Sequence, residues 1–235
     1  MPKLSIVIPT LNEEKYLPLL LEDIKNQSCK DYEVIIVDCK SEDQTSQVAK
    51  QFEKLIPDLK FYQVDKRNIG FQRNFGVRKS KGEWIIFMDA DNRLDFDFLE
   101  KIMKYILELK NPSFITTGVY IDKKNWFSFI LSIYINVGLF IFPKLGFPWL
   151  IGAFIAIRKS DFTMVDGFNQ DNHPGEDYVF AKKAVRKGLK HICLFDPRYY
   201  FSFRRIAKYG FVKSLWNYSF GGTKNYSIWL NNRKW

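Results

Sequence analysis

The sequence lacks the features that mark secreted disulfide-rich proteins, zinc proteins and two common kinds of nucleotide site. There are only three cysteines, Cys29, Cys39 and Cys193, and their spacing fits neither a disulfide framework nor a metal site. Such sparse use of cysteine is typical of a reducing compartment. Neither the Gly-x-Gly-x-x-Gly fingerprint nor the Gly-x-x-x-x-Gly-Lys-Ser/Thr loop is present. A bound nucleotide diphosphate would therefore need a metal ion and basic side chains around its phosphates.

The sequence also lacks internal repeats, low-complexity tracts and an N-terminal signal pattern. It enters an apolar strand pattern at residues 4–8, so we expect no signal sequence. Acidic residues are outnumbered, because 36 Lys and Arg against 26 Asp and Glu give a net charge of +10. This excess indicates an anionic partner, such as a nucleotide, a phospholipid surface or a nucleic acid. With 46% apolar residues over 235 positions, the chain can form one large domain.

Apolar runs alternate with amphipathic segments in the first half of the chain. Buried-strand patterns occupy residues 4–8, 33–37, 60–64 and 84–88, and helix patterns lie between them. This rhythm predicts an α/β fold with a mixed, mainly parallel sheet flanked by helices.

Polar residues stand where three of these strands end. Residues 9–13 (PTLNE) follow the first strand, Asp38 ends the second, and Asp89 and Asp91 end the fourth. The carboxyl ends of parallel strands share one edge of a sheet, where open α/β folds bind ligands. Two acids at such an edge suit Mg²⁺ or Mn²⁺ held partly by the phosphates of a substrate. Taken singly, each motif also fits a solvated turn or a helix cap.

As an ordered set, these motifs resemble glycosyltransferase family 2. The resemblance rests on residues 9–13 (PTLNE), 37–45 (VDCKSEDQT), 68–76 (NIGFQRNFG) and 89–91 (DAD). It covers residues 1–100 most strongly and continues more weakly to residue 210. The family implies a GT-A (Rossmann-like) fold and sugar transfer from a nucleotide-diphosphate donor with inversion at the anomeric carbon. One departure is residues 38–41 (DCKS), where the family usually has Asp-Asp-Gly-Ser, so a second acid and a turn glycine are missing.

The resemblance also assigns roles to single residues. It implies that Pro9, Thr10 and Glu13 line the base pocket and that Asp38 contacts the nucleoside. Arg73 would lie near the phosphates. Asp89 would contact the ribose, and Ala90 would be a further contact to the nucleotide sugar. Asp89 and Asp91 would hold the divalent metal, Mg²⁺ or Mn²⁺, with Asp91 as the more direct ligand.

Further candidate residues occur in the second half. Residues 149–158 predict a strand, and Gly152 near its start permits the close approach of a ligand. Glu176 and Asp177 open a predicted helix, where acids can simply complement the helix dipole. In the family this pair holds the catalytic base. The resemblance therefore implies that Asp177 accepts a proton from the acceptor and that Glu176 orients the site. We expect His173 to be an ordinary loop residue.

Basic residues accumulate towards the end of the chain. Arg204 and Arg205 resemble a Ser-x-Arg-Arg stretch found in part of the family, and a guanidinium there could bind the diphosphate or a lipid phosphate. A solvated basic loop is the alternative. Residues 211–235 interleave aromatic and basic side chains. We favour a membrane surface over nucleic acid as the partner of this tail, because no nucleic-acid motif accompanies it.

The longest apolar run is residues 126–142. It contains Ser128, Ser132 and Asn136, which are four apart and so share one face of a helix. Three arrangements fit this run. The flanking lysines and the Trp and Tyr residues favour a helix lying in the membrane interface. A helix buried in the protein or in a homodimer contact is the second arrangement. A transmembrane span is the third, and the run is slightly short for it.

We therefore predict a GT-A domain over residues 1–210, with a nucleotide-sugar half at 1–110 and an acceptor half at 111–210. The expected reaction is a metal-assisted single displacement onto a hydroxyl or phosphate of a glycan or polyprenyl-phosphate acceptor. We expect this reaction to serve cell-envelope glycan synthesis. The alternatives are a sugar nucleotidyltransferase and a non-catalytic, membrane-peripheral nucleotide-sugar-binding protein. We expect a cytoplasmic location, at the cytoplasmic face of the membrane, and no nucleic-acid partner. Homo-oligomers are compatible with the sequence.

Overall fold

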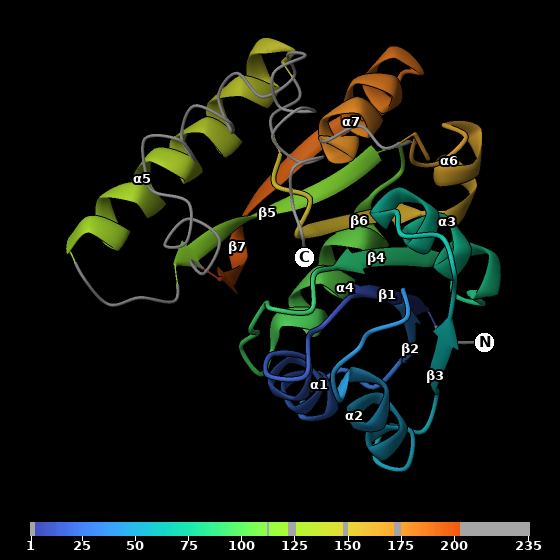
Figure 1. The fold of residues 1–235 in the computed structure, drawn as a ribbon. Coiled ribbons are helices and arrows are strands. Elements are labelled where there is room, and N and C mark those ends of the chain that lie inside the picture. The colour runs from blue at the N-terminus through green and yellow to red at the C-terminus, as the bar shows by residue number, and fades with distance from the viewer. Residues whose placement is uncertain (1–2, 112, 122–125, 148–149, 172–174, 203–235) are drawn as a thin grey trace.

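A seven-stranded sheet with the order β3-β2-β1-β4-β6-β5-β7 forms the centre of the molecule (Figure 1). The computed structural model describes residues 3–111, 113–121, 126–147, 150–171 and 175–202. The strands are β1 (Leu4–Thr10), β2 (Tyr32–Asp38), β3 (Leu59–Gln63), β4 (Trp84–Met88), β5 (Ser113–Ile121), β6 (Phe154–Arg158) and β7 (Lys190–Phe201). The helices are α1 (Leu17–Lys25), α2 (Thr45–Phe52), α3 (Ile69–Lys79), α4 (Phe98–Glu108), α5 (Trp126–Ile141), the 3₁₀ helix η1 (Phe142–Leu145), α6 (Lys159–Met164) and α7 (Glu176–Arg186).

Helices cover both faces of the sheet, which explains the uninterrupted apolar strands. Every residue of β1, β2 and β4 is buried. Side chains alternate between the two faces: Ile6 and Ile8 join the core under α1, α2 and α4, whereas Val7 joins the core under α3, α6 and α7. Figure 1 shows these two helical layers on opposite sides of the sheet. The predicted mixed, mainly parallel α/β fold is confirmed.

Strand direction brings separate parts of the chain to one edge. β1 pairs in parallel with β2 and β4, and Thr10 lies opposite Asp38 at the ends of β1 and β2. β6 is antiparallel to β4, with Met88 opposite Phe154. The start of β6 therefore lies beside the end of β4, which places residues 150–153 next to Asp89.

The second half differs in detail from the sequence-based expectation. The strand expected over residues 149–158 is confined to β6, because Gly152 and Ala153 leave the ladder and use their carbonyls at the site described below. The segment after β6 forms the short helix α6 before the turn at residues 166–168. The last strand, β7, has 12 residues and is the longest of the described strands.

The apolar run forms α5, which lies beyond β5 and β7 in Figure 1. It has 16 residues and is followed directly by η1. Among the described residues, no helix has the length and apolarity needed to cross a bilayer. The expected tail at residues 211–235 lies outside the described residues.

Candidate active site

The carboxyl ends of β1, β2 and β4 carry the predicted polar residues, and α3, α7 and the start of β6 complete the cluster. The backbone N–H of Asp89 donates to the carbonyl of Ala153 at 3.1 Å, which ties the end of β4 to the approach to β6. Ala90 is buried behind this turn. The structure thus brings together both the strand-end acids and the later Glu176–Asp177 pair.

Arg73 lies at the centre of this cluster. Its side chain is 1% exposed, although arginine is almost never fully buried unless it is paired. Its Nη2 donates to Asp89 Oδ1 at 3.0 Å and to the Gly152 carbonyl at 2.8 Å, and its Nη1 donates to Glu176 Oε1 at 3.0 Å. The guanidinium also lies 5.1 Å from the ring centroid of Phe168. One cation on α3 therefore joins β4, the start of β6 and α7.

Asp177 is held by backbone donors. Its Oδ2 accepts a hydrogen bond from the Gly152 N–H at 2.8 Å, and its Oδ1 accepts one from the Tyr178 N–H at 2.7 Å. A Cβ on residue 152 would lie only 2.8 Å from the Asp177 Cβ and Oδ2. Gly152 was expected to permit the approach of a ligand. In the structure it permits the approach of the candidate base.

Burial changes the acidity of the two α7 carboxyls. Burial, aided by the charge of Asp177, raises the pKa of Glu176 to about 7, and the Arg73 cation opposes this shift. Burial also raises the pKa of Asp177, and Arg73 again acts in the opposite direction. A carboxyl whose pKa is raised is a better proton acceptor once it is ionised. The pair titrates jointly because the two groups interact.

Asp38 is fully buried at the end of β2. Its carboxylate accepts hydrogen bonds from Thr10 Oγ1 at 3.0 Å and from the Ser41 N–H at 2.9 Å. In the following turn, Lys40 adopts a positive φ of 51° at the position where the family usually has glycine. Lys40 also forms an ion pair with Asp65. Asp38 thus fixes the conformation of the edge at which a nucleoside was expected to bind.

The other two residues assigned to the base pocket also lie at this edge. Pro9 is buried in β1 and pairs with Val37 of β2. The backbone N–H of Glu13 donates to Thr45 Oγ1 at 2.8 Å, so the segment after β1 is tied to the start of α2.

The turn after β4 holds the candidate metal ligands. Asp91 is 9% exposed, and the side chain of Asp89 is 16% exposed. Asn92 donates from Nδ2 to the Ala153 carbonyl at 2.6 Å, and its buried Oδ1 has no hydrogen-bond partner among the residues that the structure describes. Among the described residues, no three Asp, Glu, His or Cys side chains are grouped as a metal cage. Mg²⁺ and Mn²⁺ sites need only one or two carboxylates when substrate phosphates and water supply the other oxygens, so this turn fits such an ion.

Two residues of α3 that the sequence reasoning passed over have clear structural roles. Gln72 donates from Nε2 to the carbonyls of Thr10 and Val37, at 2.9 and 2.7 Å, and so joins the ends of β1 and β2. Asn74 exchanges two hydrogen bonds with the backbone of Phe168, at 2.8 and 2.9 Å. In the sequence, the signal for these two roles is that Gln72 and Asn74 flank Arg73 in the motif at residues 68–76.

Several expected residues cannot be placed. Arg204 and Arg205, expected at a phosphate, lie outside the described residues, as do His173 and the tail at 211–235.

Comparisons with known proteins identify relatives in sequence and in fold. A protein of Methanococcus voltae, named dolichyl N-acetyl-alpha-D-glucosaminyl phosphate 3-beta-D-2,3-diacetamido-2,3-dideoxy-beta-D-glucuronosyltransferase, is 29% identical over 205 residues, which cover 80% of this chain and 63% of that protein. The structure of S. aureus TarS 1-349 with UDP-GlcNAc superposes with a TM-score of 0.71 at 23% identity, covering 85% of this chain and 58% of the other.

A second solved structure shares the fold. The mannosyltransferase PcManGT of Pyrobaculum calidifontis, in complex with GDP-Man and Mn²⁺, gives a TM-score of 0.69 at 22% identity and covers 85% of this chain and 56% of the other. The chain thus spans less than two thirds of each of these three proteins. The family model described as "Glycosyl transferase family 2" matches residues 5–165, which is more than half of the chain. The chain therefore belongs to glycosyl transferase family 2 and has its GT-A fold.

Proposed function

We propose that the chain is an inverting glycosyltransferase that moves a sugar from a nucleotide-diphosphate donor to a lipid-linked acceptor. The observation that carries this proposal is the Arg73 cluster, which joins the acids after β4 to the acids that open α7. A leaving-group site and a proton acceptor are the two parts that a single displacement requires. The solved relatives bind UDP-GlcNAc or GDP-Man, and the M. voltae protein is named for a dolichyl phosphate-linked sugar.

In the proposed reaction, Asp177 takes the proton of an acceptor hydroxyl while the hydroxyl oxygen forms a bond to the anomeric carbon. The bond from that carbon to the nucleoside diphosphate breaks, and its electron pair leaves with the diphosphate. Gly152 and Tyr178 hold the Asp177 carboxylate in place through their N–H groups. No protein nucleophile is needed, because a single attack from the opposite face inverts the configuration.

Asp91 and Asp89 would hold the divalent ion, Mg²⁺ or Mn²⁺. When bound, this ion would neutralise the charge that develops on the diphosphate. Asp89 also accepts a hydrogen bond from Arg73, so the ion site and the base are linked through one side chain. We further propose that the protein acts at the cytoplasmic face of a membrane, where a lipid-linked acceptor would be presented.

The Asp177→Asn variant tests the assignment of the base. We expect transfer to fall roughly 10²–10⁴-fold, because the amide cannot accept the proton. Binding of the nucleoside diphosphate should be retained. Turnover is measured as nucleotide released from uridine-, guanosine- and thymidine-diphosphate sugars, which also identifies the donor. Unchanged turnover would remove Asp177 from this role. Conversion of the donor, with added pyrophosphate, into a nucleoside triphosphate and a sugar 1-phosphate would instead indicate a nucleotidyltransferase.

A further inference from the structure

Helix α5 presents Ser132 and Asn136 to the sheet rather than to solvent. β6 pairs with β5 only at Phe114 and Ile115, so the later part of β5 needs other partners on that side. Asn136 supplies them: its Oδ1 accepts from the Val119 N–H and its Nδ2 donates to the Val119 carbonyl, both at 2.8 Å. Ser132 Oγ donates to the same carbonyl at 3.1 Å. Ser132 and Asn136 therefore dock α5 onto β5.

The opposite face of α5 is apolar and exposed. Its large side chains follow helical spacing and are 47–75% exposed, and the list is Trp126, Phe129, Ile130, Ile133, Tyr134, Val137 and Ile141. Leu145 and Phe147, at and just after η1, are 63% and 65% exposed and extend this surface. Helices of soluble domains normally place the apolar stripe inward and the polar stripe outward. In α5 the inward face combines Ser132 and Asn136 with the buried Leu131 and Leu139, while the outward face is apolar as well. Large exposed apolar patches of this kind mark interaction surfaces.

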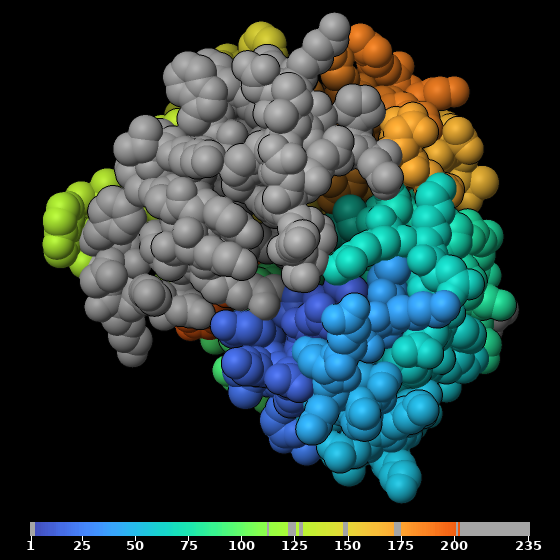
Figure 2. Space-filling view, viewed as in Figure 1, coloured from blue at the N-terminus to red at the C-terminus, as the bar shows by residue number. Residues whose placement is uncertain are grey.

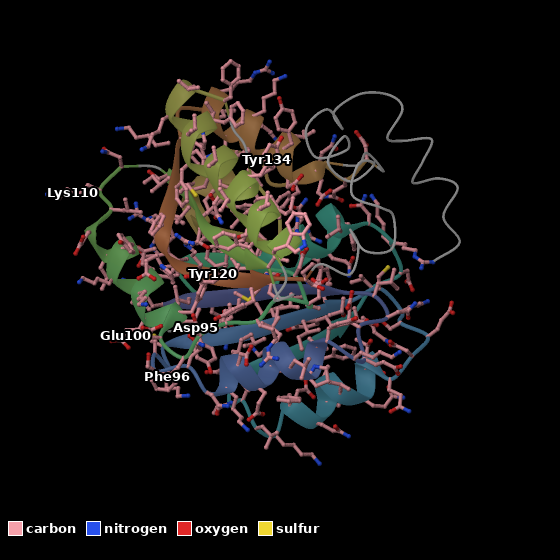
Figure 3. The ribbon with its side chains drawn as sticks, turned by 90° about the vertical axis from the view of Figure 1, so that its left-hand side faces the viewer. Asp95, Phe96, Glu100, Lys110, Tyr120 and Tyr134 are labelled. Atoms are coloured by element: carbon pink, nitrogen blue, oxygen red, sulfur yellow. The ribbon has the colours of Figure 1, made fainter. Side chains whose placement is uncertain are left out.

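Part of α5 lies at the edge of the molecule (Figure 2). Figure 2 shows one end of α5 projecting from the edge of the molecule. Figure 3 looks onto this side and labels Tyr134 on α5 and Tyr120 on β5, both of them exposed aromatic side chains.

We propose that the outward face of α5 and η1 is a preformed membrane-binding surface that lies in the headgroup region of an anionic bilayer. Charge favours this partner, because residues 126–147 contain no acid, include the exposed Lys144, and belong to a chain of net charge +10. Trp126 and Tyr134 are residue types that concentrate at membrane interfaces. At 16 residues the helix is roughly 24 Å long, so it lies along the bilayer rather than across it.

The hydrogen bonds to Val119 connect this surface to the central sheet. β5 also pairs with β6, and the approach to β6 supplies Gly152 and Ala153 to the candidate active site. Membrane binding through α5 would thus fix the orientation of the active site relative to the bilayer. This step rests on the proposed use of a lipid-linked acceptor. A second copy of the chain is a less favourable occupant, because it would bring together two molecules of charge +10.

The test is flotation of the full chain with phosphatidylcholine vesicles that contain or lack phosphatidylglycerol, at low and high salt. The variant Ile130→Ser/Ile133→Ser/Val137→Ser alters only the outward face. Its control, Leu19→Ser/Leu55→Ser/Met164→Ser, changes three similarly exposed apolar residues on other parts of the fold. We expect the α5 variant to bind anionic vesicles roughly tenfold less than the wild type or worse, and the control to differ by less than about twofold.

Other outcomes would overturn the proposal. They are wild-type protein that fails to float with anionic vesicles at low salt, an α5 variant that floats like the wild type, or a dimer that dissociates in the α5 variant. Asp177→Asn is measured in parallel and should float normally, while the α5 variant should keep its donor hydrolysis in the absence of vesicles. Membrane binding and catalysis can therefore fail independently.

Discussion

Among single residues, Arg73 has the strongest influence on the site. Burying a cation between two carboxylates costs little free energy only while both ion pairs persist, because the loss of one carboxylate leaves part of the buried charge unpaired. Sequence reasoning placed Arg73 near phosphates. The structure shows its Nη atoms occupied by Asp89, Gly152 and Glu176. Arg73 is thus a positioning residue in this structure, since it holds the groups that would act.

The acidity of Glu176 predicts how the rate depends on pH. Its pKa is raised to about 7 and that of Asp177 is also raised, mainly through burial. The base must be ionised, so kcat/KM should fall as the pH decreases through the joint titration of the pair. Glu176→Gln removes a negative charge beside Asp177. It also leaves the Arg73 cation with one carboxylate partner fewer. Both effects favour ionised Asp177, and the acidic limb should move to lower pH by roughly half a unit or more.

A pH–rate profile of the wild type and Glu176→Gln measures this shift. Glu108→Gln is the control, because Glu108 is an exposed residue of α4. An acidic limb that stays in place, or that moves to higher pH, would contradict the coupling between Glu176 and Asp177.

At the level of elements, the Gly70–Gly76 motif explains how α3 packs against the sheet. A Cβ at Gly76 would lie 2.3 Å from Val7 Cγ1, and a Cβ at Gly70 would lie 2.3 Å from the carbonyl oxygen of Asn169. The helix therefore approaches β1 closely enough for Arg73 to reach the strand ends. One glycine meets a side chain and the other meets a backbone atom, which gives a matched pair of variants.

Gly76→Ala should destabilise the protein by about 1–3 kcal/mol through overpacking. Val7→Ala removes the obstructing methyl groups, so the Gly76→Ala/Val7→Ala double variant should be more stable than the sum of the single effects predicts. We expect a coupling of about 1 kcal/mol or more, measured by urea unfolding. Gly70→Ala combined with Val7→Ala is the control and should be additive, because a backbone oxygen is the obstacle there. Additivity in both cycles would show that Val7 does not set the distance between α3 and β1.

Sequence patterns predicted some elements much better than others. The strands β1, β2 and β4 were found because they are mostly apolar and buried along their whole length, and their ends placed Thr10, Asp38 and Asp89 at one edge. The orientation of α5 could not be found in this way. Spacing showed that Ser132 and Asn136 share a face with Ser128, but the direction of that face depends on the open edge of β5. The contacts of Arg73 likewise depend on residues about 80–100 positions away.

At the level of the whole molecule, ligand binding should be visible as a gain in stability. A nucleoside diphosphate that binds only the folded chain stabilises it by about 2.7 kcal/mol at a concentration of 100 times its Kd. For a chain of this size, that gain raises Tm by roughly 5–10 °C. The proposed ion site after β4 requires the effect to depend on Mg²⁺ or Mn²⁺. UDP, GDP and dTDP should therefore be compared, each with the metal and with EDTA.

Variants separate the contribution of the metal from that of the nucleoside. Asp91→Asn should lose the metal-dependent part of the Tm shift, because an amide is a weaker ligand than a carboxylate, and should retain any part that persists in EDTA. Asp58→Asn is the control, since Asp58 is exposed in the loop before β3. Asp89→Asn has a further effect, because it also removes the charge that pairs with Arg73 at 3.0 Å, so it should lower Tm even without ligand. If EDTA leaves the wild-type shift unchanged, the Asp89–Asp91 turn is not a metal site, and Arg73 alone accounts for the burial of Asp89.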